Sequence, residues 1–277
     1  MVVFTIFEPP AEIKMPGVLF LVNSLFYLLL NKSSYITFVC IFTTANNLKS
    51  KTMKILIVSA TTLEIKPLLT HFKFIERINA QMNRYTFNKM EIDVLTTGVG
   101  MVPTAYLMGK ALANNHYDGA LNLGIAGSFV RDLELGEVVH ITHDQFPELG
   151  AEQGEYFLSL IDLKLLEENY FPYKDGQMVN DLPIKSKTIN QLKTVRSITV
   201  NRVHTTNKSI EKIRNRCNPA TESMEGAAFF FACFAEDIPC AQIRAVSNYV
   251  EQRDTDRWSI PQAIENLNKL IMKVLHE

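Results

Sequence analysis

The sequence predicts an α/β protein in which one domain is built on a β-sheet that helices cover on both faces. Two observations carry this prediction. From Met53 onward, segments typical of strands alternate with segments typical of helices, as they do in chains of βαβ units. In addition, residues 53–277 contain neither an internal repeat nor a low-complexity linker at which they could divide into two domains.

Apolar runs and turn residues predict the elements of the first half of this domain. Lys54–Ser59 is a continuous apolar strand, and a helix follows at 64–72, where Pro67 falls in a first turn that tolerates proline. After these we expect neighbouring strands at 84–88 and 91–96, a helix at about 102–114 and a strand at 120–123.

The second half is less regular. Residues 153–193 are rich in loops, with one short helix near 159–168. The remaining elements expected here are strands at 137–143 and 198–203, a short helix at 209–216 and a closing amphipathic helix at 261–276.

One helix carries the first candidate site residue. Gly226–Ala235 is apolar or small on every side, which is typical of a buried helix. Glu225 stands at its first turn, where a carboxylate meets free N–H groups and the positive end of the helix dipole. A strand at 240–246 follows and ends at Ser247 and Asn248. Ligands of open α/β sheets lie beyond the carboxyl ends of strands, so these polar groups are candidate ligand contacts. A helix-terminal carboxylate without a ligand is the alternative for Glu225.

The composition is that of an ordinary globular protein, with 277 residues, 47% hydrophobic and 21% charged, and a net charge of −1. No cluster of Lys and Arg is flanked by aromatic residues, which argues against a nucleic-acid-binding surface. The four cysteines show neither a CxxC pair nor metal-ligand spacing. This pattern favours reduced thiols in a cytoplasmic protein over a disulfide framework, and it predicts no metal site.

Residues 1–52 differ from the rest of the sequence. Two apolar runs, at 17–30 and 35–44, each fall short of the ~20 apolar residues that a membrane-spanning helix needs. No clear small-residue cleavage site follows the weakly basic start. A signal or anchor, a poorly packed extension and translated upstream sequence remain open. We favour the last, with Met53 as the initiator, and expect no membrane association for 53–277.

Two motifs about twenty residues apart resemble the nucleoside phosphorylase/nucleosidase family. They are Ser-Met-Glu-Gly-Ala at 223–227 and Arg-Ala-Val-Ser-Asn at 244–248. Within the family the sequence is most similar to the futalosine hydrolases, and next to the methylthioadenosine/S-adenosylhomocysteine nucleosidases. The resemblance extends over 53–277 and is weak across 153–215. It implies a twisted central mixed sheet flanked by helices, a homo-oligomer of two or more chains, and no metal or organic cofactor.

The resemblance also implies residue roles. In that family the Met-Glu pair holds the ribose, which assigns Met224 and Glu225 to the sugar. The last residue of the second motif, here Asn248, faces the purine. Further substrate contacts are implied at Ala60, Gly98, Ile125, Gly127 and Ser247.

Glu64 is the candidate general base. It matches the family's water-activating glutamate in its distance from the opening Met53-Lys54. A general base must lie within hydrogen-bond distance of the water that it deprotonates. The alternative is a surface glutamate in a first helical turn, without a catalytic role.

The glycine loops at 98–100 and 124–127 could bring backbone close to a ligand or form tight turns without one. They do not spell GxGxxG, and no acidic residue follows a strand at the required distance, which argues against a dinucleotide site. Phosphorylases of the family carry an arginine near the corresponding loop, and residues 121–127 contain none. The resemblance therefore implies water as the nucleophile and hydrolysis as the reaction.

Asn248 indicates which base is released. Adenine-specific nucleosidases of the family have an aspartate here that donates a proton to N7, and an amide cannot transfer a proton in this way. The amide can donate to a 6-oxo group while its carbonyl accepts from a protonated N7. This pattern suits hypoxanthine, the base of futalosine. A strand-end Asn that binds only backbone groups is the alternative.

Trp258 lies ten residues beyond Asn248. In the adenosine nucleosidases this spacing places an aromatic ring against the 5′ substituent of the ribose. Futalosine carries an aryl ketone with a carboxylate there, and Arg253 and Arg257 could bind that carboxylate bidentately. The alternative is a core tryptophan flanked by solvated charges.

The sequence thus predicts a cytoplasmic enzyme that hydrolyses the N-glycosidic bond of futalosine and releases hypoxanthine, on the futalosine route to menaquinone. Two alternatives stay open. One is a nucleosidase for methylthioadenosine, S-adenosylhomocysteine or 6-amino-6-deoxyfutalosine, against which Asn248 argues. The other is a nucleoside-binding relative without activity, against which the presence of both Glu64 and Glu225 argues.

Overall fold

The computed structural model describes residues 27–29, 37–39, 52–252 and 254–277, and the chain divides into two compact units, Met1–Lys51 and Thr52–Glu277. In the first unit, β1 (Tyr27–Leu29) pairs antiparallel with β2 (Thr37–Val39). The expectations for 1–52 otherwise fall outside the described residues. The second unit has the α/β fold that the alternation of strands and helices predicts.

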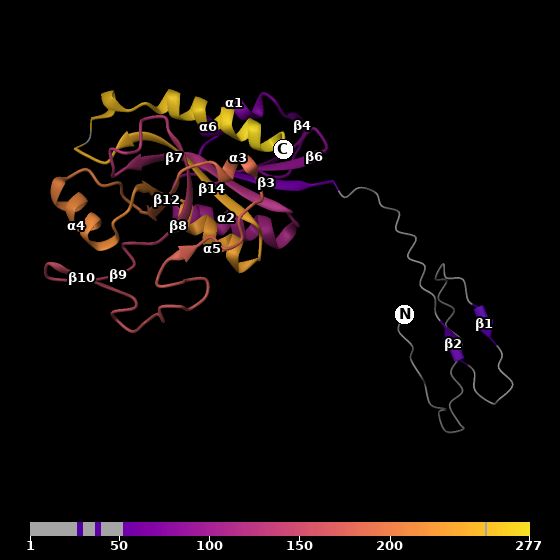
Figure 1. Ribbon diagram of the computed structural model, residues 1–277, viewed down its shortest axis with the longest axis horizontal. Helices are drawn as coiled ribbons and strands as arrows, with labels where there is room; N and C mark the ends of the chain where they lie inside the picture. The colour runs from indigo at the N-terminus through magenta and orange to yellow at the C-terminus, as the bar shows by residue number, and fades with distance from the viewer. Residues whose placement is uncertain (1–26, 30–36, 40–51, 253) are drawn as a thin grey trace, which may run out of the picture. The chain divides into compact units, whose positions relative to one another are not determined.

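One large mixed sheet organises the second unit (Figure 1). From edge to edge its strands are β11 (Met178–Val179), β8 (Val138–Asp144), β12 (Thr194–Thr199), β13 (Thr221–Ser223), β7 (Gly119–Ser128), β3 (Lys54–Ser59), β6 (Met90–Thr96), β5 (Met82–Phe87) and β4 (Lys73–Arg77). Off this path, β14 (Cys240–Tyr249) pairs parallel with β7 and antiparallel with β8. Because β3, β6, β7 and β14 run parallel, their carboxyl ends meet at one edge of the sheet.

Helices cover both faces of this sheet. On one face, α1 (Thr62–Leu69) and α3 (Lys187–Asn190) contact the long α6 (Ile260–Leu275). On the other face, α2 (Met101–Asn114) packs against α5 (Gly226–Ala235), as Figure 1 shows. The remaining elements are α4 (Asn207–Cys217), a 3₁₀ turn at Thr255–Arg257, and a separate hairpin of β9 (Gly150–Gln153) and β10 (Tyr156–Ser159). Among the described residues, no helix combines the length and the apolar character needed to cross a bilayer.

The central strand β3 shows why both faces are covered. Ile55 and Ile57 pack into the cluster that includes α1 and α6, whereas Leu56 and Val58 pack into the cluster that includes α2 and α5. Side chains alternate between the faces of a strand, so a continuous apolar run supplies both layers of the core. Burying such a side chain stabilises the fold by about 1.5–3 kcal/mol.

Several expectations for individual elements are corrected. The helix α5 is buried over most of its length but not all round, because Phe231 is 42% exposed. No helix forms at 159–168: the backbone of Lys164 has a left-handed φ of 57°, which an α-helix of L-residues excludes. The predicted strand at 198–203 lies instead at Thr194–Thr199, where it pairs with β8 and β13. The short strands β4, β9, β10 and β13 were not predicted.

A buried carboxylate ties β3, β5 and β6 together. Asp93 is fully buried, and both its oxygens accept hydrogen bonds from Arg84, at 2.8 and 3.1 Å. The hydroxyl of Tyr117 (2.9 Å) and the ammonium of Lys54 (3.2 Å) complete its environment. Burial alone would raise the pKa of Asp93, but the hydrogen bonds from Arg84 and Tyr117 and the charge of Lys54 hold that pKa below its ordinary value.

Replacing Asp93 by Asn should therefore destabilise the fold by about 3 kcal/mol at neutral pH, because it breaks a largely buried ion pair. A carboxyl whose pKa is depressed in the folded state contributes stability above its unfolded pKa and loses it as the pH falls. The difference in free energy of unfolding between parent and variant should thus shrink below the ordinary carboxyl pKa of 3.8. Denaturant titrations at pH 7 and pH 3.5 measure this. Glu76→Gln, which removes an exposed partner of Arg84, is the matched control and should have little effect.

Candidate active site

Glu64 is buried at the start of α1, beside the carboxyl end of β3. Its Oε2 accepts hydrogen bonds from the backbone N–H and hydroxyl of Thr61 (both 2.9 Å) and from the hydroxyl of Ser59 (3.1 Å). Its Oε1 accepts the backbone N–H of Ile125, on β7, at 3.1 Å. The alternative of a surface glutamate is therefore wrong. The capping contacts occupy Oε2, and Oε1 is the oxygen left to accept a further hydrogen bond.

Glu225 is the N-cap residue of α5 and is also buried. Its Oε1 accepts the backbone N–H of Gly100 at 3.0 Å. The same loop is joined to β3, because the N–H of Gly98 donates to the carbonyl of Ala60 (3.0 Å). Gly98 and Gly100 have φ values of 81° and 108°, a region that glycine adopts without strain. Burial raises the pKa of Glu225, the charge of Arg244 and the Gly100 N–H lower it, and the charge of Glu64 raises it.

The guanidinium of Arg244 lies near both carboxylates, and no role was predicted for it from the sequence. Its side chain is fully buried, with Nε donating to Gln242 Oε1 (3.2 Å) and Nη2 donating to Asn122 Oδ1. Its Nη1 has no hydrogen-bond partner among the described residues. A Cβ placed on Gly124 would overlap Nη1 and lie 2.9 Å from Glu64 Oε1, so these two atoms face each other across the glycine. We call Glu64, Glu225 and Arg244 the carboxylate–arginine cluster.

A signal for Arg244 was present in the sequence. It is the one charged residue in the strand segment 240–246, where Gln242 is the one other polar residue. Buried charges are kept where they are paired or functional. Residues 121–127 contain no arginine, yet the guanidinium of Arg244 lies against Gly124 from the neighbouring strand. The absence of an arginine from residues 121–127 therefore does not mean that this loop lacks a guanidinium group beside it.

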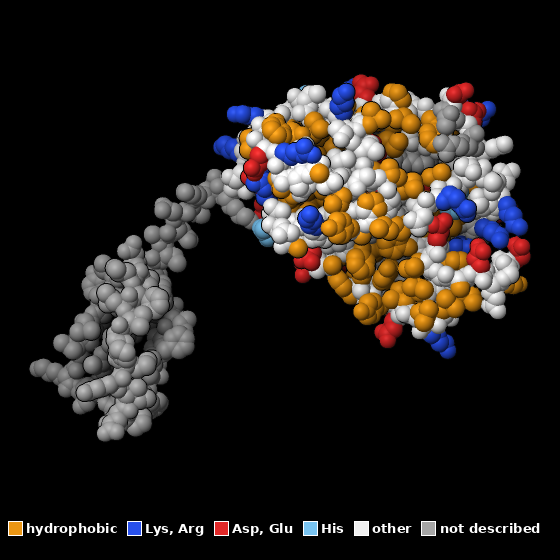
Figure 2. Space-filling view, turned by 180° about the vertical axis from the view of Figure 1, so that it is seen from behind, with side chains coloured by type: hydrophobic (Ala, Val, Ile, Leu, Met, Phe, Trp, Pro, Cys, Tyr) orange, Lys and Arg blue, Asp and Glu red, His pale blue; other side chains and the backbone are white. Residues whose placement is uncertain are grey.

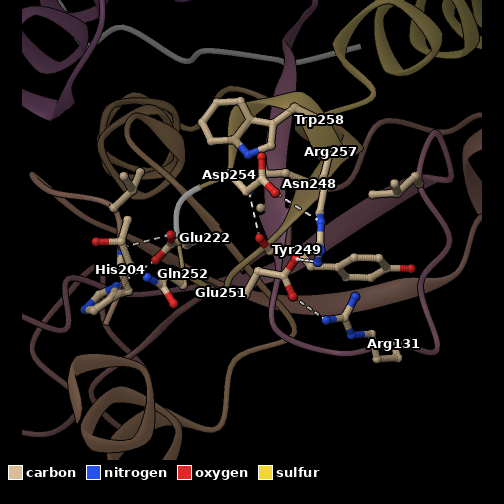
Figure 3. A pocket seen from close by; sticks show the side chains of 14 residues that line it. Arg131, His204, Glu222, Asn248, Tyr249, Glu251, Gln252, Asp254, Arg257 and Trp258 are labelled. Carbon is tan, nitrogen blue, oxygen red and sulfur yellow. Dashed lines mark hydrogen bonds and ion pairs between the residues drawn. The ribbon is translucent and has the colours of Figure 1, made fainter. Parts of the chain in front are cut away.

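A cavity of about 230 Å³ lies at the carboxyl ends of β7 and β14, where Gly127 and Asn248 line it (Figure 3). Its lining includes four residues predicted from the sequence, namely Gly127, Asn248, Arg257 and Trp258. Glu64 and Glu225 do not line it. The two parts of the site are nonetheless adjacent, because Ile125 contacts Glu64 and Gly127 lines the cavity two residues further along β7, about 7 Å by strand rise. The candidate active site therefore has a charged cluster at one end and an open cavity at the other.

Asn248 lies at the junction of β14 with the cavity. Its Oδ1 accepts the hydroxyl of Ser247 (2.8 Å), and its Nδ2 donates to the carbonyl of Tyr249 (3.1 Å). A side-chain amide has two donors and two acceptor sites, so one N–H and one lone pair remain for a ligand. A Cβ on Gly127 would lie 3.3 Å from Nδ2, so the absence of a side chain there leaves the amide accessible.

Charged side chains surround the mouth of the cavity. Arg257 pairs with Asp254 (3.1 Å) and Glu251 (3.8 Å), and Arg131 pairs with Glu251 (2.5 Å) while stacking over the ring of Tyr249. The two guanidinium groups are well exposed, so their ion pairs contribute only about 0–1 kcal/mol and can be exchanged. Arg253, also predicted to bind substrate, falls outside the described residues.

His204 and Glu222, which were not predicted from the sequence, form a pair that lines the cavity wall. Glu222 accepts the backbone N–H of His204 at 3.1 Å and binds the ring Nδ1 of the same residue at 2.7 Å. Both side chains are nearly buried. Figure 3 shows this pair on one side of the cavity and Arg131 with Tyr249 on the other. No motif in the sequence indicated that these two residues would meet.

The predicted site residues thus gather in two groups. In the first group, Glu64 and Glu225 lie near Arg244, Ile125 binds Glu64, Gly98 binds Ala60 in the loop that also contacts Glu225, and Met224 precedes Glu225 in the chain. The second group lines the cavity and consists of Gly127, Asn248, Arg257 and Trp258. Ser247 connects the groups through its bond to Asn248. Among the described residues, no three His, Cys, Asp or Glu side chains are arranged to hold a metal ion.

Comparison with known proteins identifies the family. The family model described as the phosphorylase superfamily matches residues 54–276. The chain belongs to this superfamily. The fold agrees with solved members: a methylthioadenosine/S-adenosylhomocysteine nucleosidase from Colwellia psychrerythraea, in complex with adenine, matches with a TM-score of 0.67 at 20% identity. That match covers 82% of this chain and 96% of the other. The predicted central mixed sheet with flanking helices is confirmed.

Members of the superfamily with known names are similar to this chain in sequence or in fold. A futalosine hydrolase from Thermus thermophilus is 30% identical over 189 residues, which are 66% of this chain and 80% of that protein. An aminodeoxyfutalosine nucleosidase from Campylobacter jejuni is 26% identical over 223 residues, 76% and 93% of the two chains. The native futalosine hydrolase of Helicobacter pylori has a similar fold, with a TM-score of 0.66 at 17% identity over 81% of this chain and 98% of that one. The predicted resemblance is confirmed.

Adding a methyl group at Gly124 should disrupt the carboxylate–arginine cluster. In Gly124→Ala the new Cβ overlaps Arg244 Nη1 and displaces the guanidinium from Glu64. A displacement of about 1 Å in a catalytic group can cost ~10²-fold in rate, so we expect a loss of that order in nucleosidase activity. Gly109→Ala is the matched control, because a Cβ there meets nothing within 4 Å, and its activity should stay at the parental level. Parental activity in a folded Gly124→Ala variant would contradict this account of the cluster.

Proposed function

We propose that this superfamily member hydrolyses the N-glycosidic bond of futalosine and releases hypoxanthine, within the futalosine route to menaquinone. The chain is an N-glycosyl hydrolase, as its relatives among the futalosine hydrolases and nucleosidases indicate. The observation that supports a 6-oxopurine is the amide of Asn248, which keeps one donor and one acceptor free on the cavity wall beside Gly127.

The carboxylate–arginine cluster supports a role in the attack of water. With the ribose held by Met224 and Glu225, a water beside Oε1 of Glu64 would lie near the free Nη1 of Arg244. The bond between the sugar C1′ and the purine N9 breaks, and its electron pair leaves with the base. Glu64 takes a proton from the water as it attacks C1′. Two buried carboxylates stabilise the positive charge that develops on the sugar, because charge preorganised in a water-poor site acts at low dielectric.

Asn248 would stabilise the departing base. Its free N–H donates to the 6-oxo group, and its free carbonyl lone pair accepts from N7–H, whose proton comes from solvent because the amide cannot supply one. The contact to the 6-oxo group strengthens as negative charge moves onto the purine. The opposite wall, formed by His204 and Glu222, closes the cavity around the base.

The mouth of the cavity suits the 5′ substituent. Trp258 offers an aromatic surface there, and Arg257, with Arg131 across Glu251, offers guanidinium groups for a carboxylate. Arg253 completes the proposed set. A substrate carboxylate could replace Glu251 as the partner of either arginine, since an exposed ion pair is readily exchanged.

A homo-oligomer of the 53–277 domain is part of the proposal. The loop before α2 and the helix itself expose Val99 (56%), Val102 (74%) and Tyr106 (68%), close to the Gly100 contact with Glu225. Figure 2 shows hydrophobic side chains gathered over a broad area of one face of the folded unit. Contiguous exposed apolar surface of this kind is typical of protein–protein contacts.

A nucleosidase for 6-amino-6-deoxyfutalosine is the second candidate, because the Campylobacter jejuni relative aligns over 93% of its length. An amino group in place of O6 would face a donor of Asn248 and leave buried groups mispaired, at about 1–3 kcal/mol each. A flipped amide could accept from the amino group but could not hand a proton to N7. The penalty should therefore appear in kcat more than in affinity.

This difference gives the decisive assay. Purified chain is offered futalosine, its 6-amino analogue, inosine and methylthioadenosine, and the free base is measured. Futalosine should give the highest kcat/KM, and Asn248→Asp should lose activity on futalosine while gaining, relatively, on the 6-amino analogue. Equal kcat/KM for the two futalosines in the parent chain would refute the assignment of Asn248, whatever the variant does.

Glu64→Gln should abolish most of the activity. It removes the base, and loss of a general base typically costs ~10²–10⁴ in rate. The new amide NH₂ must also face a donor, either at Thr61 or at Ile125, so some stability is lost as well. Thr61→Ala is the matched control: it removes one capping contact of Glu64 but leaves the carboxylate, and should lower Tm with kcat largely preserved. If folded Glu64→Gln hydrolyses futalosine at the parental rate, Glu64 is not the base.

A further inference from the structure

Asp144, at the end of β8, is a buried carboxylate that the mechanism above does not use. Its Oδ1 accepts hydrogen bonds from the hydroxyl of Thr199 (3.0 Å) and the backbone N–H of Gln145 (2.8 Å). Its Oδ2 accepts from Nε2 of Gln242 at 3.0 Å. Burying a carboxylate costs free energy even when it is well hydrogen-bonded. Asp144 is therefore a candidate for a role beyond packing.

One arm of this network leads to Arg244. An ionised carboxylate only accepts hydrogen bonds, so Asp144 turns the NH₂ group of Gln242 toward itself and leaves Gln242 Oε1 on the other side. That oxygen accepts Nε of Arg244 at 3.2 Å. With Nε held there and Nη2 held by Asn122, the free Nη1 is directed toward Glu64 across Gly124.

The other arm leads to the first turn of α5. The hydroxyl of Thr199 donates its hydrogen bond to Asp144. Its oxygen can therefore accept the backbone N–H of Ala227, at 2.7 Å. That N–H is one of the first of the helix, which have no partner within it. The preceding N-cap residue is Glu225. The arm through Gln242 also passes this turn, because a Cβ on Gly226 would overlap both Asp144 Oδ2 and Gln242 Oε1.

We propose that Asp144 is a positioning residue for the glycosidic cleavage: through Gln242 it orients Arg244 beside Glu64, and through Thr199 it fixes the turn that carries Glu225. The proposal rests on the function proposed above, since it concerns the same site. Asp144 itself touches no substrate.

The titration of Asp144 agrees with this geometry. Burial raises its pKa to about 6, against the hydrogen bonds of Gln242 and Thr199 and the charge of Arg244. Arg244 is the charged group that acts on it, and its hydrogen-bond partners are neutral. Protonation would place a hydrogen on an oxygen that now accepts, so one arm would lose its partner as the pH falls below about 6.

A reciprocal exchange of two side chains tests the proposal. Asp144→Asn puts an NH₂ group against a donor on one arm, and Gln242→Glu puts a second carboxylate against Asp144. Each single variant should lower kcat by about 10²-fold through displacement of the groups around Arg244. In the double variant the new amide donates to the new carboxylate, which still accepts from Arg244. Its kcat should return to within about tenfold of the parent.

The outcomes separate the possible failures. Additive losses in the double variant, or parental kcat in folded Asp144→Asn, would overturn the positioning role, whereas a purely structural role would shift Tm without recovery of kcat. If Asp144→Asn does not fold, Gln242→Met severs only the arm to Arg244, and parental kcat in that variant would overturn the role equally. If the parent chain releases no base from any of the four nucleosides, the proposed function fails, and the positioning role fails with it.

Discussion

The site depends on one constraint: the guanidinium of Arg244 is buried near two carboxylates, and the missing side chain of Gly124 leaves room for it. A charge removed from water is tolerated only when its partners are fixed around it. Arg244 meets this condition through hydrogen bonds to Gln242 on its own strand and Asn122 on the neighbouring strand, and through its charge interaction with Glu225. The strands β3, β7 and β14 end at one edge of the sheet, so groups far apart in the sequence reach one point.

This arrangement joins fold and chemistry. Glu64 is part of the capping box of α1, so its carboxylate is oriented by a helix end that needs an acceptor there. Glu225 is the N-cap residue of α5, but its carboxylate is held by the backbone N–H of Gly100 rather than by the helix. The two helices pack on opposite faces of the sheet, and α1 begins directly after β3 while α5 begins beside the loop that follows β6. For Glu64, Oε2 accepts the capping contacts, and Oε1 lies beside Gly124 near Arg244 Nη1.

Much of this could be predicted from the sequence, and the limits have physical causes. Buried elements such as Lys54–Ser59 and Gly226–Ala235 can be predicted from the sequence, because a buried element is a long run of apolar residues. The pairing of His204 with Glu222 and the network around Asp144 have no such pattern in the sequence. They join segments that are brought together only by the order of strands in the sheet. The expected helix at 159–168 was wrong for a local reason: Ser159 and Asp162 exchange the contacts that begin a helical turn, but the left-handed φ of Lys164 ends it after that turn.

The groups that contact Asn248 and those that orient Arg244 form separate sets of hydrogen bonds. The contacts of Asn248 run to Ser247 and Tyr249, its neighbours in the chain, whereas the network that orients Arg244 runs through Gln242, Asp144 and Asn122. No hydrogen bond between the described residues joins Asn248 directly to that network. The energetic coupling between two groups of residues is small when they share no partners. If the proposed function holds, a substitution at Asn248 should therefore change the purine edge that is recognised while the residues around Arg244 keep their geometry.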